Sequence, residues 1–213
     1  MIIYLAMIFI LFETLSMIFN QYFLNVIFLG IEFPLNISVV FFCLGFFVLD
    51  MVTELYNNKL ADKLIYGKIL CQVLFIVFAE IGILGAGLQG SQLSQIISTT
   101  PMMVLNGIIA SIIGYKITTS IMQKLKIMYH GEFLAIRYLC STLPGEIIFS
   151  LIFSALSFTT GRTISQFCMI FITLTIMKLI LSLLFSVAVV PITNFLRHLV
   201  GPDQEVQEFI PFT

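Results

Sequence analysis

The chain has 213 residues, of which 60% are hydrophobic and only 10% are charged, and its mean hydropathy is +1.11. Soluble domains carry about a quarter charged residues, so this composition excludes an ordinary soluble protein and indicates an integral membrane protein. The net charge of −1 gives no sign of nucleic-acid binding. Since each helical span needs about twenty residues, the length allows about six spans and no separate soluble domain.

The first apolar segment, residues 2–28, is predicted to be a retained transmembrane helix. It lacks the basic start and the small-residue cleavage site of a secretory signal, so we expect nothing to be removed. Glu13 and Asn20 lie seven positions apart and therefore share a face, which should look inward. A short loop with Glu32 and Pro34 leads to the second helix.

The second helix, residues 35–56, carries Asp50, Thr53 and Glu54 at positions i, i+3 and i+4, which places them on one face. A carboxylate at membrane depth is costly unless it faces a partner or a wet cavity, so these acids indicate a substrate or proton site. Alternatively, this end of the helix has simply reached the lipid headgroups. The short polar connection 57–63 predicts that the second and third helices are antiparallel neighbours.

The third helix, residues 64–86, carries Glu80 among apolar neighbours. An uncharged loop over 87–100 follows, and Pro101 is suited to be the first residue of a fourth helix that extends to 126. Within that helix, Gly107 and Gly114 would let a neighbouring helix approach closely.

The fifth helix begins near Arg137 and contains the pair Pro144–Gly145, which should break or kink it and free backbone groups for a ligand. Glu146 is therefore expected to touch substrate. The sixth helix, residues 165–198, should bend at Pro191. Its Lys178 lies too deep to reach the membrane surface, so we expect it to pair with Glu80, Glu146 or Asp50.

The basic residues are distributed unequally between the two sides of the predicted bundle. One side has Lys59, Lys63, Lys68, Lys124, Lys126, Arg137 and Arg197, and the other has Arg162 alone. Since basic residues favour the cytoplasmic side, we predict an all-α, polytopic bundle of six transmembrane helices with both termini in the cytoplasm. The bundle covers residues 1–200, and a short cytoplasmic tail covers 201–213.

Three motifs, in order along the chain, resemble those of a known family. The run LDMVTELYNNKLADKLI at 49–65 resembles the D-x-x-T-E-x-Y-G element of the queuosine precursor transporter family, also called the vitamin uptake transporter family. RYLCSTLPGEIIFSLIF at 137–153 resembles its R-x-x-x-S-T fifth helix, and KLILSLLFSVAVVP at 178–191 its lysine-containing last helix. Asn57, Thr118 and Phe149 depart from the family pattern, since members commonly have Gly, Asp and Asp there.

The resemblance implies a bacterial inner-membrane importer of 7-deazaguanine bases such as preQ0, preQ1 or queuine, the precursors of the modified tRNA nucleoside queuosine. A guanine-like base presents neighbouring N–H donors to a carboxylate and a carbonyl to Asn, Lys or Arg, while aromatic rings such as Phe46 could stack on its faces. The resulting candidate substrate-binding residues are Asn20, Phe46, Asp50, Thr53, Glu54, Glu80, Arg137, Ser141, Thr142, Glu146 and Lys178. Of these, the resemblance marks Asn20, Asp50, Thr53, Glu54, Arg137, Ser141, Thr142 and Lys178.

Two other hypotheses about the function are a substrate-binding subunit and an intramembrane enzyme. The chain could be the substrate-binding subunit of a multi-component importer with a separate energising module, and a homodimer is a further possibility. An intramembrane enzyme is disfavoured, because the sequence has no HExxH or GxSxG motif. The four cysteines lie in apolar stretches without ligand spacing and are expected to be small core residues, so we expect no metal and no cofactor.

Overall fold

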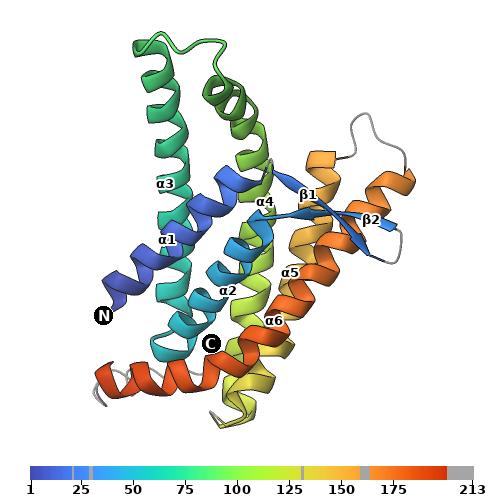
Figure 1. Cartoon of the computed structure of the whole chain (residues 1–213). Helices are drawn as coiled ribbons and strands as arrows, with labels where there is room; N and C mark the ends of the chain where they lie inside the picture. Colours follow the sequence, from blue (N-terminus) through green and yellow to red (C-terminus); the bar gives the residue numbers. More distant parts are fainter. Residues whose placement is uncertain (21, 29–30, 131, 159–163, 201–213) are drawn as a thin grey trace.

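Six helices and one β-hairpin make up the computed structural model, which describes all residues except 21, 29–30, 131, 159–163 and 201–213 (Figure 1). The predicted tail therefore lies outside the described residues, as does Arg162. The elements are α1 (Ile2–Phe19), β1 (Phe23–Phe28), β2 (Ile31–Asn36), α2 (Ser38–Leu55), α3 (Asn58–Gly85), α4 (Gln92–Met128), α5 (Leu134–Phe158) and α6 (Ile164–Val200). All six helices are long and apolar enough to cross a membrane, which confirms the predicted number of spans.

The hairpin replaces the end of the predicted first helix, so the expectation that this helix continues to Phe28 is wrong. β1 pairs with β2 in antiparallel register, with Phe23 opposite Asn36 and Phe28 opposite Ile31. The two segments, FLNVIF and IEFPLN, are rich in aromatic and β-branched residues that favour strands. Pro34 is tolerated because a two-stranded sheet has only edge strands.

The fourth helix begins nine residues earlier than predicted. Ser91 starts it as an N-cap, and its side-chain oxygen accepts a hydrogen bond from the backbone N–H of Ser94 at 3.1 Å. Pro101 therefore lies inside the helix rather than at its start. The sequence-based boundary failed because a proline that can begin a helix can also interrupt one.

The fifth helix is continuous through Pro144–Gly145, so the predicted break is absent from this part of the described chain. Gly145 has a packing role instead. A Cβ atom at Gly145 would lie 2.8 Å from the Gly114 carbonyl oxygen and would overlap the Thr118 hydroxyl, and one at Gly114 would lie 3.0 Å from the Gly145 oxygen. The two glycines let α4 and α5 pack closely, which confirms the prediction for Gly114.

α2 lies at the centre of the bundle, and all but three of its 18 residues are buried (Figure 1). It contacts α1, α3, α4 and α6, so it forms the axis around which the other helices pack. The prediction that all four cysteines are core residues is wrong for two of them. Cys43 on α2 is buried, whereas Cys140 and Cys168 are exposed on the bundle surface, and all four are free thiols.

The α2–α3 junction, the α4–α5 junction and the end of α6 lie at one end of the bundle, which we call the basic end. The C-terminal part of α6, which contains Pro191 and is drawn in red, runs across this end (Figure 1). Lys68, which the sequence analysis counted among the residues of this side, is instead buried inside the bundle and paired with Glu13. The hairpin lies toward the opposite end.

Candidate functional site

A cavity lies inside the half of the bundle nearer the hairpin, and every one of the six helices contributes to its wall. The centre of a water molecule can move through about 70 Å³ of it, which is room for several waters. The lining residues are Glu13, Ser16, Met17, Asn20, Ser38, Val39, Phe42, Lys68, Gln72, Met103, Val104, Gly107, Phe149, Ser150, Phe153, Leu174 and Lys178.

An acid on α1 and a base on α3 form one wall of the cavity. The Glu13 carboxylate and the Lys68 ammonium are 2.6 Å apart, and both side chains are almost fully buried. The Tyr115 hydroxyl donates a hydrogen bond to Glu13, and the Gln72 amide donates to the Glu13 backbone oxygen at 3.4 Å. Gly45 makes room for this carboxylate, since a Cβ there would overlap it.

The predicted inward face of the first helix is confirmed, because Glu13 and Asn20 both line the cavity. Asn20 stands at the C-cap of α1, where its backbone oxygen accepts a hydrogen bond from the Asn36 amide at 2.8 Å. Asn36 in turn accepts from the backbone N–H of Ser38, the first residue of α2. These contacts fix the end of α1 and the start of α2 at the cavity wall.

Lys178 contributes to the cavity wall from α6. Its ammonium donates to the Ser150 hydroxyl at 2.9 Å and lies 4.1 and 4.2 Å from the ring centres of Phe42 and Phe149. Of the three predicted partners, Glu146 interacts electrostatically with Lys178, but within the described chain no ion pair joins Lys178 to Glu80, Glu146 or Asp50. This buried cation, which is 4% exposed, therefore directly contacts a hydroxyl and two ring faces, and the Glu146 carboxyl group interacts with it electrostatically without forming an ion pair.

Three phenylalanines give the cavity its apolar surface. The rings of Phe42 and Phe149 have centres 4.1 Å apart, and Phe149 stacks on Phe153 at 5.6 Å with an interplanar angle of 13°. Phe46, the predicted stacking residue, is fully buried against Phe42 and Tyr115 and does not line the cavity. Phe149 lies where members of the resembled family commonly have Asp, so the departure noted from the sequence falls in this wall.

Two buried carboxyl groups lie between the cavity and the basic end. The Ser182 hydroxyl donates to Glu146 at 2.8 Å, and the Thr142 hydroxyl donates to Asp50 at 2.6 Å. The second oxygen of each carboxyl group, Oε1 of Glu146 and Oδ1 of Asp50, has no hydrogen-bond partner among the residues that the structure describes. Each side chain is only 1% exposed.

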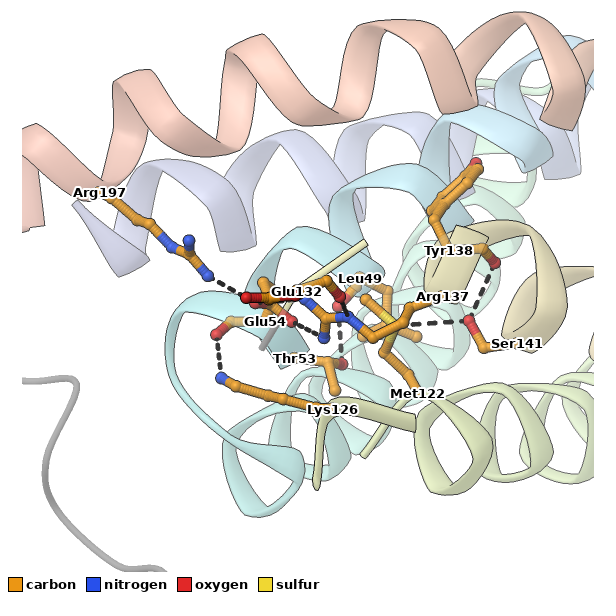
Figure 2. A network of polar contacts seen from close by, with 10 residues as sticks. All are labelled: Leu49, Thr53, Glu54, Met122, Lys126, Glu132, Arg137, Tyr138, Ser141 and Arg197. Carbon is orange, nitrogen blue, oxygen red and sulfur yellow. Dashed lines mark hydrogen bonds and ion pairs between the residues drawn. The ribbon is translucent and has the colours of Figure 1, made fainter. Parts of the chain in front are cut away.

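At the basic end, Glu54 is enclosed by cationic groups, as Figure 2 shows. Arg137 donates to both of its carboxylate oxygens, at 2.7 and 3.1 Å, and Arg197 lies 2.5 Å from one of them. The Lys126 ammonium donates to the Glu54 backbone oxygen at 2.7 Å, and Arg137 also donates to the Glu132 backbone oxygen. We call Glu54, Lys126, Arg137 and Arg197 the basic cluster.

The structure divides the predicted site residues into four groups. Asn20 and Lys178 line the cavity, and Asp50, Thr142 and Glu146 lie between it and the basic end. Glu54 and Arg137 pair in the basic cluster, with Thr53 and Ser141 nearby and bonded to the backbone of their own helices (Figure 2). Phe46 is a packing residue, and Glu80 is half-buried on α3 and does not line the cavity.

Sequence reasoning left several lining residues out of the predicted site. Glu13 was predicted to face inward but was not counted among the site residues, and Lys68, with which it pairs, was treated as a marker of membrane orientation. A usable signal was present, because Lys68 and Gln72 are four residues apart on an otherwise apolar stretch of α3. Among the described residues, no group of three His, Cys, Asp or Glu side chains could hold a metal ion.

Comparison of the sequence with known proteins identifies a family. A family model described as "Putative vitamin uptake transporter" matches residues 36–193. No curated protein and no solved structure matches the chain. The matched segment begins at the last residue of β2 and includes the cavity-lining residues of α2 to α6.

Proposed function

Because the chain belongs to the vitamin uptake transporter family, we propose that it imports a 7-deazaguanine base, a queuosine precursor, across the bacterial inner membrane. A multi-pass membrane protein of an uptake family needs a site for its substrate within the bilayer. The observation that carries the proposal is a cavity walled by all six helices, in which buried acidic, basic and aromatic side chains face one space.

The cavity offers the groups that a guanine-like base requires. Such a base presents two adjacent N–H donors on one edge, a pattern that a carboxylate such as Glu13 can accept, and a carbonyl oxygen that Lys68, Lys178 or Asn20 can bind. Phe42 and Phe149 supply flat apolar surfaces for the ring faces. Bound base would replace part of the Glu13–Lys68 contact, so both residues keep a hydrogen-bonding partner throughout.

The retention of these charges in the bilayer supports a transport role. Ionisable side chains at membrane depth are expensive, and they are commonly found where a substrate or ion pathway requires them. Glu13, Lys68 and Lys178 come from three different helices and are each buried, yet all of them reach the cavity wall. A purely structural bundle would be expected to fill these positions with apolar residues.

The cavity and the basic end are separated by a packed interior, which fits alternating access. From Phe46 onward every residue of α2 is buried, and the basic cluster closes the end of the bundle below it. We propose that the base enters from the hairpin end and leaves past the basic cluster after α6 and α5 move. With the basic end in the cytoplasm, as the charge distribution predicts, this direction is uptake.

Ligand-induced stabilisation of the purified protein tests the proposal. Binding stabilises the folded state by mass action, by about 2.7 kcal/mol at a hundredfold excess over the dissociation constant. We expect 7-deazaguanines to raise the unfolding temperature and adenine to leave it unchanged, because adenine offers no carbonyl to the lysines. Glu13→Gln should abolish the shift, and Glu80→Gln, a matched substitution outside the cavity, should preserve it.

Uptake by the isolated chain separates a complete transporter from a subunit. Liposomes that contain only this protein should take up radiolabelled base. Failure of every deazaguanine both to stabilise the protein and to enter such liposomes would refute the proposed substrate. Binding without entry would instead indicate that an energising module is needed.

A further inference from the structure

A row of buried polar side chains extends from the cavity to the basic end, and substrate binding does not explain it. We call this row, which consists of Ser150, Glu146, Thr142, Asp50 and Glu54, the polar row. On α5, Ser150, Glu146 and Thr142 follow one another at intervals of four residues, which is a rise of roughly 6 Å per step. Ser150 contacts Lys178 at the cavity, Glu146 contacts Ser182, and Thr142 contacts Asp50. One turn further along α2 from Asp50 is Glu54, in the basic cluster.

Glu146 and Asp50 differ from Glu54, the third acid of the polar row, in the hydrogen-bond partners of their carboxyl oxygens. Glu54 has both oxygens bound by guanidinium groups, as expected of an acid that joins helices within the fold. Glu146 and Asp50 each accept one hydrogen bond from a hydroxyl, and each has one oxygen without a partner in the described part of the chain. A proton on that oxygen removes the buried charge, and its loss restores an acceptor for water when the site opens.

We propose that Glu146 and Asp50 carry the proton that drives uptake, an inference that rests on the proposed function. Once the hairpin end opens and water reaches the buried carboxyl group, a proton from a hydronium ion forms an O–H bond at Oε1 of Glu146. It then passes to Asp50, where it binds Oδ1, and leaves to water on the other side once the basic end opens. One proton enters with each base, and each carboxyl group returns to its starting state.

The groups around the two carboxyls couple this proton to the substrate. Glu146 faces Lys178, one turn before Ser182 on α6, and Lys178 lines the cavity. A base bound to Lys178 therefore changes the electrostatic environment of Glu146, which is the condition for coupling between two sites. The titratable and charged groups facing the two acids are Glu13 on α1 (through Lys178), Cys43 and Glu54 on α2, Tyr115 on α4, Tyr138 on α5 and Lys178 on α6.

Two assays in proteoliposomes distinguish coupling of uptake to the proton gradient from transport of the base itself. Net accumulation is measured with an inward proton gradient at zero membrane potential, and exchange is measured between labelled external base and unlabelled internal base without any gradient. For a neutral base and one proton, about tenfold accumulation per pH unit is the ceiling, since the two concentration ratios balance. We expect the wild type to approach this ceiling and to make the external medium alkaline when base is added.

The variants then locate the proton carriers. Glu146→Gln and Asp50→Asn should reduce gradient-driven accumulation to the level without a gradient, whereas exchange should continue because neither residue lines the cavity. Glu80 is an acid outside the polar row, so Glu80→Gln should behave as wild type in both assays. If one of these two variants fails to fold, the other still tests the proposal, because loss of either proton carrier should abolish gradient-driven accumulation.

Several results would overturn this proposal. Wild-type accumulation that ignores the proton gradient or follows a sodium gradient would do so, as would undiminished accumulation in Glu146→Gln. The proposed function would survive each of these results if exchange of the deazaguanine is observed. Absence of exchange in the wild type would reject the substrate and, with it, the proton inference.

Discussion

The basic cluster and the cavity are both built from buried charges, but they satisfy these charges differently. In the basic cluster, Glu54 is held by Arg137 and Arg197, and the cationic groups outnumber the acid that they surround. In the cavity, Glu13 and Lys68 pair with each other, but Lys178 forms no ion pair with the described residues and directly contacts the Ser150 hydroxyl and two ring faces. The first region is closed within the protein, and the second leaves hydrogen-bonding capacity for a ligand.

This difference separates two reasons for keeping a charge inside a membrane. A fully paired cluster recovers part of its desolvation cost through contacts within the fold, so substitution of one of its residues should lower the free energy of unfolding. A cation whose only hydrogen-bond partner is neutral recovers little of that cost. Its removal should therefore weaken substrate binding and hardly change the free energy of unfolding. Substitutions in the two regions should therefore give opposite patterns of effect.

Arg137→Ala should produce the largest loss of stability. Arg137 is fully buried and supplies two hydrogen bonds to Glu54, so its removal leaves that carboxylate with Arg197 alone. Breaking a buried ion pair in this way costs about 3–5 kcal/mol of unfolding free energy. Chemical or thermal unfolding in detergent would measure the change.

The control for Arg137→Ala comes from the same end of the bundle. Lys124 is exposed, so Lys124→Ala should alter the unfolding free energy by about 0.5 kcal/mol or less. Equal effects of the two substitutions would show that general loss of positive charge, rather than the Glu54 pairing, determines the result.

Gly145→Ala tests the helix packing that separates the two regions. Gly145 lies on α5 between Arg137 and Ser150, and an added methyl group would meet the Thr118 side chain and the backbone oxygen of Gly114. Overpacking of this kind costs about 1–3 kcal/mol. Gly67→Ala is the matched control, since nothing lies within 4 Å of a Cβ there. A stable Gly145→Ala variant would contradict the close α4–α5 packing.

Lys178→Met should weaken binding without weakening the fold. Methionine retains most of the aliphatic length between Phe42 and Phe149 but removes the buried ammonium, and replacing a poorly compensated buried charge by an apolar group is often neutral or stabilising. We expect at least about a tenfold loss of affinity for base, or about 1.4 kcal/mol. Titration of base against the variant, with its unfolding temperature measured in parallel, would reveal this pattern, and the reverse pattern would place Lys178 with the structural charges.

The sequence predicted the spans better than the partners within them. Hydropathy and length identified six helices, and the spacing of Asp50, Thr53 and Glu54 predicted a buried polar face, because both signals are local along the chain. The hairpin was missed because Phe, Val and Ile suit a strand as well as a membrane helix. Which base meets which acid depends on how helices pack, so Lys68 appeared to mark membrane orientation until its contact with Glu13 was seen.

Arg197→Ala should have the smallest effect and shows where the closed region meets solvent. Its side chain is 33% exposed, although it lies 2.5 Å from Glu54, so solvent and salt screen the pair. We expect a loss of about 1 kcal/mol or less, reduced further at high salt. Unfolding measured at low and high ionic strength would check this, with Arg137→Ala as the salt-insensitive comparison. If Arg197→Ala instead lowered the unfolding free energy as much as Arg137→Ala, the end of α6 would be held in the basic cluster as firmly as α5. The proposed exit of the base past the basic cluster, which requires α6 to move, would then be disfavoured.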